Sequence, residues 1–90
     1  MTTPAQRLER YLHKRATEAG GTTRKYTSPG RQGVADRLVF LPGGRVLLVE
    51  VKAPGDRIRP QQRREAEVMG RLGHVTRFVS SKEQIDEVFE

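Results

Sequence analysis

Three charged side chains near the middle of the sequence have types and spacing that could form a reactive site. Glu50-Val51-Lys52 ends an apolar, strand-like segment, and Asp36 begins the segment before it. Side chains alternate between the two faces of a strand, so Glu50 and Lys52 share one face. Two carboxylates that meet across a hairpin can share a cation. The pattern therefore predicts a cation site with a positively charged side chain beside it.

The pairing of the two segments decides whether this site exists. Residues 36–41 and 45–52 are expected to be strands, joined by the loop 42–44. A three-residue loop places Asp36 directly opposite Glu50, with Cβ atoms about 5 Å apart. A two-residue turn would shift the register by one residue and separate the carboxylates. The three-residue register is the one that forms the site.

The remaining elements follow from helix caps and apolar periodicity. Thr3, Pro4 and Gln6 form a capping box at the start of a helix, and Gly20-Gly21 ends it. The expected order is a helix at 4–19, a strand at 22–28, the hairpin strands, a helix from Pro60 that carries Ala66, Met69 and Leu72, a strand at 74–79, and a short helix after Ser81. Both faces of the hairpin are apolar, so both should be covered by helices. An α/β fold with a mixed central sheet is expected.

The composition limits the class of protein. Ninety residues are expected to form one domain, residues 1–90, whose core is small enough that a partner subunit would help its stability. The chain has no cysteine, which excludes disulfides and thiolate zinc sites. No apolar run reaches the roughly 20 residues that span a bilayer, and the N-terminal residues do not resemble a signal peptide. A cytoplasmic protein with no membrane partner is expected.

The charge indicates a polyanionic partner. There are 17 Lys and Arg against 11 Asp and Glu, which gives a net charge of +6. Thirteen of the basic residues are Arg, and the forked guanidinium group suits phosphate oxygens well. We therefore expect the chain to bind nucleic acid.

The order of the motifs resembles a known family. Glu9, Ala35-Asp36, Glu50-Val51-Lys52 and Pro60-Gln61-Gln62 follow one another as in the VRR-NUC family, the virus-type replication-repair nucleases of the PD-(D/E)XK superfamily. A glycine-rich loop and a Pro-Gly-Gly hairpin also stand in the family's order. Ala35 replaces the proline of the family's Pro-Asp pair, which removes a rigid residue but no ligand atom. The resemblance implies a restriction-endonuclease-like PD-(D/E)XK fold, an αβββαβ core with a short C-terminal helix.

The resemblance also implies a metal-dependent DNA endonuclease. Asp36 and Glu50 are hard oxygen ligands suited to Mg²⁺ or Mn²⁺, and the Val51 carbonyl can complete the inner shell beside waters. Lys52 should remain a cation beside two carboxylates. It is therefore assigned to orienting the attacking water and to offsetting charge in the transition state. An ordinary salt bridge to one of the acids is the alternative for Lys52.

Two more polar side chains are candidates for the catalytic site. Gln62 occupies the family's glutamine position in the first turn of the second helix and can reach back toward Lys52; an ordinary helix-start residue is the alternative. Glu9 can bind a second cation or a metal-bound water, or can belong to a solvated helix face beside His13. His13 and His74 lack partners at metal-ligand spacing and are expected on a helix surface and at a strand start.

Basic residues flank the expected site on its loops and helix start. Such residues are well placed to hold the phosphates on either side of a cut. The candidates for DNA binding are Lys25, Arg31, Arg37, Arg57, Arg59, Arg63 and Arg64.

A homodimer that cuts four-way junctions is the expected active form. The apolar residues Ile85, Val88 and Phe89 exceed what so short a helix needs to dock, which predicts a two-fold interface there. Single-domain members of the family that this chain resembles are junction-resolving dimers. A monomer that nicks flexible or single-stranded DNA is the alternative.

Two other functional classes remain open from the sequence. The chain could be a catalytically silent nucleic-acid-binding module in which Asp36 and Glu50 are structural. It could also be an interaction protein whose basic face meets an acidic partner, which the salt dependence of DNA binding would distinguish.

Overall fold

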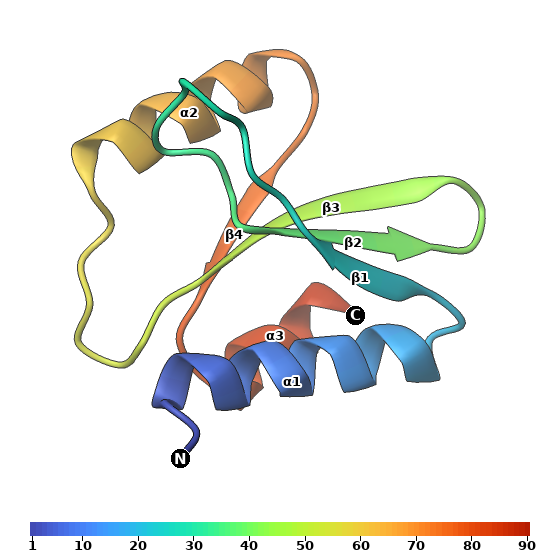
Figure 1. The fold of residues 1–90 in the computed structure, drawn as a ribbon. Helices are drawn as coiled ribbons and strands as arrows, with labels where there is room; N and C mark the ends of the chain where they lie inside the picture. Colours follow the sequence, from blue (N-terminus) through green and yellow to red (C-terminus); the bar gives the residue numbers. More distant parts are fainter.

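The computed structural model describes residues 1–90 and has three helices around a four-stranded sheet (Figure 1). Its elements are α1 (Pro4–Glu18), β1 (Thr22–Lys25), β2 (Arg37–Leu41), β3 (Arg45–Val51), α2 (Pro60–Arg71), β4 (Thr76–Val79) and α3 (Lys82–Val88). The expected order is confirmed, although β1 ends at Lys25 rather than Ser28 and β4 starts at Thr76 rather than His74. None of the helices has the length and apolar character needed to cross a membrane.

Helix α1 forms where its capping signals predict. The Gln6 N–H donates to Thr3 Oγ1 at 3.1 Å, and the Thr3 N–H donates to Gln6 Oε1 at 2.9 Å. Beyond the helix, Gly20 adopts a φ of +87°, a left-handed conformation that glycine takes without steric cost. One side of α1 is buried through Leu8, Leu12 and Ala16.

The sheet has the order β1-β2-β3-β4, with β1, β2 and β3 antiparallel and β4 parallel to β3. In the hairpin, Leu41 pairs with Arg45, which is the register that a three-residue loop predicts. The two glycines of that loop have φ values of +82° and +77°. The next position beyond the ladder in the same register brings Asp36 opposite Glu50. The backbone thus places the two acids at one end of the hairpin.

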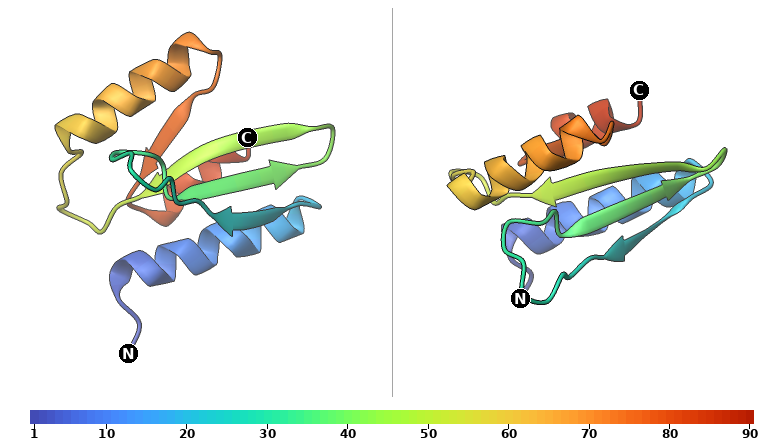
Figure 2. Two further views of the ribbon diagram at one scale, coloured as in Figure 1. Left: turned by 45° about the horizontal axis from the view of Figure 1, so that its top comes forward. Right: turned by 90° about the horizontal axis from the view of Figure 1, so that it is seen from above.

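One face of the sheet is covered by α1 and α3, which also pack against each other (Figure 2). The core between these layers consists of Leu8, Leu12, Ala16, Val39, Val49, Val51, Val79, Ile85 and Val88. A polar contact also joins the two helices. The Tyr11 hydroxyl donates to Asp86 Oδ1 at 2.6 Å, and Arg15 pairs with the same carboxylate.

Helix α3 is therefore part of the core, and the prediction that it forms a two-fold interface is wrong. Ile85 is fully buried and Val88 is 5% exposed, since both point toward α1 and the sheet. Phe89 is half-buried against the same core, and the Arg15 guanidinium lies over its ring. The apolar residues of this short helix are used within one chain.

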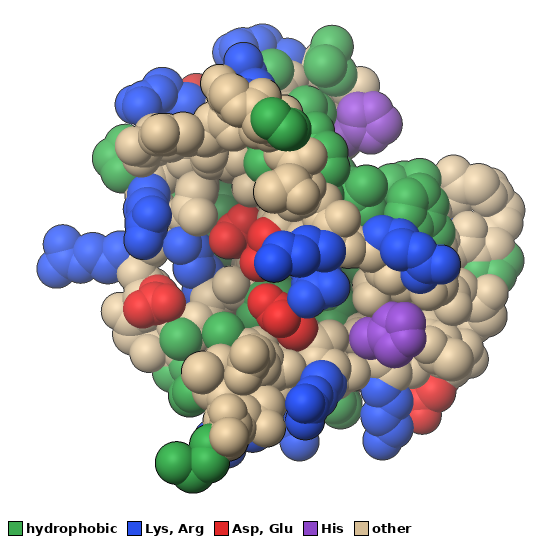
Figure 3. All heavy atoms as spheres, in the orientation of Figure 1, with side chains coloured by type: hydrophobic (Ala, Val, Ile, Leu, Met, Phe, Trp, Pro, Cys, Tyr) green, Lys and Arg blue, Asp and Glu red, His purple; other side chains and the backbone are tan.

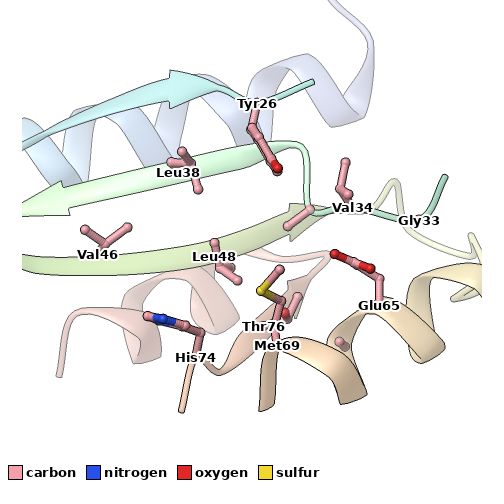
Figure 4. A pocket seen from close by; sticks show the side chains of 12 residues that line it. Tyr26, Gly33, Val34, Leu38, Val46, Leu48, Glu65, Met69, His74 and Thr76 are labelled. Carbon is pink, nitrogen blue, oxygen red and sulfur yellow. The ribbon is translucent and has the colours of Figure 1, made fainter. Parts of the chain in front are cut away.

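The other face of the sheet is only partly covered. Helix α2 contacts the sheet mainly along β4, and a cavity of about 310 Å³ remains between α2 and β2–β3 (Figure 4). Leu38, Leu48, Ala66 and Met69 are among its lining residues. Val46 lines this cavity and is 42% exposed, so part of the apolar surface on this side remains in contact with water. Helices thus cover one face fully and the other in part, so the expectation that both faces would be covered is only partly met.

Candidate active site

The end of the β2–β3 hairpin brings the two predicted carboxylates together. The Asp36 N–H donates to Glu50 Oε1 at 3.1 Å, and the Val51 N–H donates to Asp36 Oδ1 at 3.4 Å. On its other side, the Asp36 carbonyl accepts the Tyr26 N–H at 2.9 Å. Glu50 is only 8% exposed. The pairing that the hairpin register predicts is therefore present, and the Asp36 backbone is held by Tyr26, which directly follows β1, and by the Glu50 side chain of β3.

Burial gives both carboxylates an unusual proton affinity. Loss of water, together with the smaller effect of the nearby Asp36 charge, raises the pKa of Glu50 to about 7, while Lys52 acts in the opposite direction. Burial likewise raises the pKa of Asp36; the Val51 N–H opposes this rise and the Glu9 charge adds to it. Two close carboxylates with little water around them repel each other when both are ionised. A bound cation would offset that repulsion.

The oxygen atoms at this end of the hairpin suit a hard divalent cation. Asp36 and Glu50 supply carboxylates, the ligands that Mg²⁺ and Mn²⁺ prefer. Within an extended strand, the N–H and C=O of one residue point to the same side. Because the Val51 N–H points at Asp36, the Val51 carbonyl faces that side too. No group of three or more His, Cys, Asp or Glu side chains is arranged to hold a metal, so the rest of a coordination shell would be waters or substrate oxygens.

Lys52 and Gln62 lie beside this pair. The Lys52 N–H donates to the Val79 carbonyl at 2.8 Å, which continues the β3–β4 pairing to the edge of the site. None of the ion pairs in the structure includes Lys52, so its salt-bridge alternative is not formed. Gln62 Nε2 donates to Glu50 Oε2 at 3.4 Å, and Gln62 Oε1 accepts the Arg59 N–H at 2.9 Å. Gln62 therefore both caps α2 and contacts a candidate ligand.

Glu9 reaches the site from α1 but is engaged by an arginine. Arg37 Nη2 donates to Glu9 Oε2 at 2.9 Å, and both side chains are about three-quarters buried. The Glu9 charge still acts on Asp36, whose pKa it raises. The structure thus brings Glu9 close to Asp36 as a charged neighbour and pairs it with Arg37.

The loop before β2 is held tightly against the start of α2. A Cβ added to Gly33, which has a φ of +85°, would lie 2.3 Å from the Gln61 carbonyl oxygen, so only glycine fits. Arg31 donates through Nε to Glu65 Oε1 at 2.7 Å, and Glu65 is 5% exposed. Of the predicted DNA-binding residues, Arg31 is therefore engaged in an ion pair that links this loop to α2.

Most of the other predicted DNA-binding residues are on the surface. Lys25, Arg57, Arg59, Arg63 and Arg64 are all exposed. Arg59 lies close enough to Glu50 for its charge to lower the pKa of that carboxyl. Figure 3 shows Lys and Arg side chains on several sides of a small acidic group on this face of the molecule. Such a surface can hold phosphates around a cation site.

Some polar residues around the site were not identified from the sequence. Glu65 is nearly buried on α2, at a position next to the apolar stripe that the helical spacing indicated. His13 Nδ1 lies 2.8 Å from Thr23 Oγ1, although His13 was expected only on a helix surface. The contact of Glu65 with Arg31 joins distant segments, and the contact of His13 with Thr23 joins segments separated by a turn. The local spacing of residues in the sequence therefore does not indicate either contact.

Comparisons with known proteins agree with the geometry. Residues 3–81 match the VRR-NUC domain family. The chain is 42% identical over 76 residues to "Putative nuclease p44" of Acyrthosiphon pisum secondary endosymbiont phage 1, which covers 84% of this chain and 82% of that protein. A solved structure described as a VRR_NUC domain superposes with a TM-score of 0.90 at 35% identity, covering 98% of this chain and 96% of the other. The chain therefore belongs to the VRR-NUC family of nucleases and has the PD-(D/E)XK-like fold.

Proposed function

We propose that this protein is a Mg²⁺-dependent DNA endonuclease that hydrolyses phosphodiester bonds at the Asp36–Glu50 site. The observation that carries the proposal is the pair formed by the buried Glu50 and the partly buried Asp36, joined through backbone hydrogen bonds at the end of the hairpin, with Lys52 beside them. A pair held in this way is suited to a divalent cation. The basic surface around it supports DNA as the substrate.

Asp36, Glu50 and the Val51 carbonyl would hold the metal. A bound Mg²⁺ or Mn²⁺ would polarise a phosphoryl oxygen and make hydroxide available near neutral pH. The remaining tasks belong to side chains of this chain. Lys52 orients the attacking water and offsets negative charge that develops on the phosphoryl group. Gln62, fixed by its two hydrogen bonds, positions Glu50 and can donate to the scissile phosphate.

Glu9 has a secondary role in this proposal. Its carboxylate, held by Arg37 beside Asp36, can accept a hydrogen bond from a water at the cation or help to hold a second cation. Arg37 keeps the glutamate in place and limits the repulsion between Glu9 and Asp36. Arg57, Arg59, Arg63 and Arg64 contact the phosphates on either side of the cut.

The proposed substrate is branched DNA, with four-way junctions preferred, and the proposed active form is a homodimer. One chain has one such site and would make one nick. Two sites related by a two-fold axis could make paired cuts in a junction that is itself roughly two-fold symmetric. The partly open apolar cavity beside α2, which Val46, Leu38 and Leu48 line, supports a second copy as its cover, since a monomer would leave this surface in water.

A cleavage assay on a panel of DNA structures tests this proposal. Linear duplex, flap, fork and four-way junction substrates of equal length are incubated with Mg²⁺, with Mn²⁺ and with EDTA. Cleavage with either metal, none in EDTA and the fastest rate on the junction are expected. Binding of DNA without cleavage under any of these conditions would instead identify a silent DNA-binding module. Equal rates on linear and junction DNA would retain the nuclease and remove the junction preference.

A further inference from the structure

A polar groove lies next to the proposed catalytic site, between α1 and the β1–β2 strands. It has a volume of about 520 Å³, within the range of sites that hold small molecules. Six residues line it and none is apolar: Gln6, Glu9, Arg10, His13, Thr23 and Arg37. The four from α1 recur at intervals of three and four residues, so they share one face of the helix. The apolar stripe of α1 faces the core, and this polar face borders the groove.

The groove has a donor with no acceptor. Arg37 uses Nη2 to bind Glu9, while its Nε is buried and has no hydrogen-bond partner. A buried donor without a partner destabilises the folded state, so such groups usually meet a ligand or water. Because this atom has almost no exposed surface, the Arg37 side chain would have to rotate slightly for an anion oxygen in the groove to accept its hydrogen bond.

His13 is held in position for the same anion. Its Nδ1 lies 2.8 Å from Oγ1 of Thr23, and Thr23 is 6% exposed, so the ring is tied to a rigid strand residue. When the Thr23 hydroxyl donates to Nδ1, the proton of the neutral ring is on Nε2; in the charged ring both nitrogens carry protons. In these two states Nε2 is a hydrogen-bond donor, whereas in the neutral tautomer with its proton on Nδ1 it is an acceptor; an anion at Nε2 favours the first two.

Arg10 adds a mobile positive charge at the groove. It is exposed, and its single hydrogen bond is a long one of 3.5 Å from Nη1 to Thr2 Oγ1. Its guanidinium can therefore turn to a ligand at little cost. With Arg10 and Arg37 against one glutamate, the groove carries a net positive charge before His13 is counted.

The position of the groove connects it to the cleavage site. Arg37 follows Asp36 directly, and neighbouring residues of an extended segment point to opposite sides. Asp36 therefore faces the catalytic pair while Arg37 faces the groove, and the two sites share one stretch of backbone. A DNA strand that crosses the catalytic pair can place a neighbouring phosphate in the groove.

We propose that this groove binds a backbone phosphate of the DNA strand being cut, with Arg10, His13 and the Arg37 Nε as its donors and Thr23 as the residue that positions His13. This inference rests on the proposed nuclease function. Its consequence is that α1 forms one wall of the DNA path and helps set the position of the strand relative to the carboxylates.

The test measures binding without cleavage. DNA affinity is determined in EDTA, by fluorescence anisotropy over a series of salt concentrations, for Arg10→Ala, His13→Ala and the control Lys14→Ala. Lys14 is exposed on the same helix and does not line the groove. Arg10→Ala and His13→Ala are expected to weaken binding by roughly tenfold, and Arg10→Ala to lower the salt slope by about 1, whereas Lys14→Ala changes the affinity much less.

A second arm identifies the phosphate. Uncharged methylphosphonate groups are placed singly at each position around the cut. At one backbone position near the cut, the methylphosphonate should weaken DNA binding by the unmodified protein. The same methylphosphonate should weaken binding by Arg10→Ala or His13→Ala much less, because these variants have already lost the contact to that phosphate. His13→Gln, which keeps a hydrogen-bonding group next to Thr23, should recover part of the loss and shows that folding is not the cause.

The proposal would be overturned if Lys14→Ala lost as much DNA affinity as Arg10→Ala and His13→Ala. It would also be overturned if no methylphosphonate position weakened binding of the unmodified protein more than binding of the two groove variants. Because no cleavage is needed, a protein that binds DNA through this groove but never cuts it would refute the nuclease and keep the groove. A protein that cuts DNA while the groove variants bind DNA normally would keep the nuclease function and refute the phosphate-binding groove.

Discussion

At the residue scale, the chemistry of the site depends on how deeply Glu50 is buried beside a second carboxylate. Burial raises the pKa of Glu50 to about 7, and Asp36 shifts in the same direction. Folding alone therefore places the pair in a state that favours a proton or a metal ion. Lys52 lowers the pKa of Glu50 but forms no direct ion pair, which leaves its amine available to water or substrate.

The stability of the metal-free protein should fall as the pH rises toward neutrality. Glu50 holds its proton up to about pH 7 when folded but releases it near its ordinary pKa of 4.5 when unfolded. The unfolded state therefore binds fewer protons in this window, and stability decreases across it. Melting curves in EDTA should show a larger fall from about pH 5 to about pH 7.5 than Glu50→Gln shows. A cost of 1 kcal/mol shifts the melting temperature of a domain this size by roughly 4–8 °C, which is measurable.

Added Mg²⁺ should reverse this loss, because the metal competes with the proton for the same oxygens. Its stabilising effect should be larger above pH 7 than below pH 6, as the pKa of Glu50 is about 7. Identical pH profiles for the unmodified protein and Glu50→Gln would show that the carboxyl is not desolvated as described.

Lys52→Ala should slow cleavage without lowering the affinity of the protein for the metal ion. Removal of one preorganised cation from the transition state costs on the order of 10²-fold in rate. Mn²⁺ affinity, measured by calorimetry, should stay close to that of the unmodified protein, since Lys52 supplies no ligand atom. Lys82→Ala on α3 is the control. An unchanged cleavage rate for Lys52→Ala would make the lysine an ordinary surface residue.

At the element scale, the site is assembled by three contacts between segments. The hairpin register sets Asp36 against Glu50, the N-terminus of α2 brings Gln62, and the loop before β2 is fixed to α2 through Arg31 and Glu65. This last contact makes Arg31 a structural residue in addition to any role at DNA.

Arg31→Ala should destabilise the fold. It leaves the nearly buried Glu65 carboxylate without its partner, at a cost of about 1–3 kcal/mol. The melting temperature of Arg31→Ala should fall, and that of the exposed neighbour control Arg64→Ala should not. The double change of Arg31 and Glu65 to alanine should recover part of the loss, because no unpaired carboxylate remains. If Arg31 acted only on DNA, Arg31→Ala would bind DNA more weakly and melt normally.

The elements and the hairpin register could be predicted from local signals. The capping box at Thr3, Pro60 at a helix start and the three-residue loop at 42–44 each act over a few residues. Contacts between distant segments could not be predicted from the sequence. The pairing of Arg31 with Glu65 and of His13 with Thr23 depends on how loops and helices pack, and the apolar residues of α3 could be assigned to the core only once the position of α1 was known.

At the scale of the whole molecule, the two faces of the sheet differ. Helices α1 and α3 seal one face, while α2 leaves a cavity with the exposed Val46 at its lining on the other (Figures 1 and 4). The Asp36 and Glu50 carboxylates lie at the end of the same hairpin. If a second copy covers the open face, the geometry of the dimer would fix the separation of the two sites.

Val46→Glu should therefore convert the proposed dimer to a monomer. Val46 is 42% exposed, so a single chain tolerates the charge, while a partner surface would not. Sedimentation should show a smaller species, and paired cuts in a junction should become single nicks. Glu87→Lys on the exposed side of α3 is the control and should leave the assembly unchanged. A monomeric unmodified protein, or a Val46→Glu variant that keeps its size and its paired cuts, would rule out this interface.

The most direct test of the central claim compares cleavage and binding for Asp36→Asn, Glu50→Gln and the unmodified protein with Mg²⁺ on one junction substrate. Each change removes one ligand charge and leaves the basic surface intact. Cleavage should fall below about one-hundredth of the unmodified rate, since loss of a ligand removes several kcal/mol of transition-state stabilisation. DNA affinity should be retained. Cleavage by either variant above that level, in a protein that still folds and binds DNA, would contradict a metal site at Asp36 and Glu50.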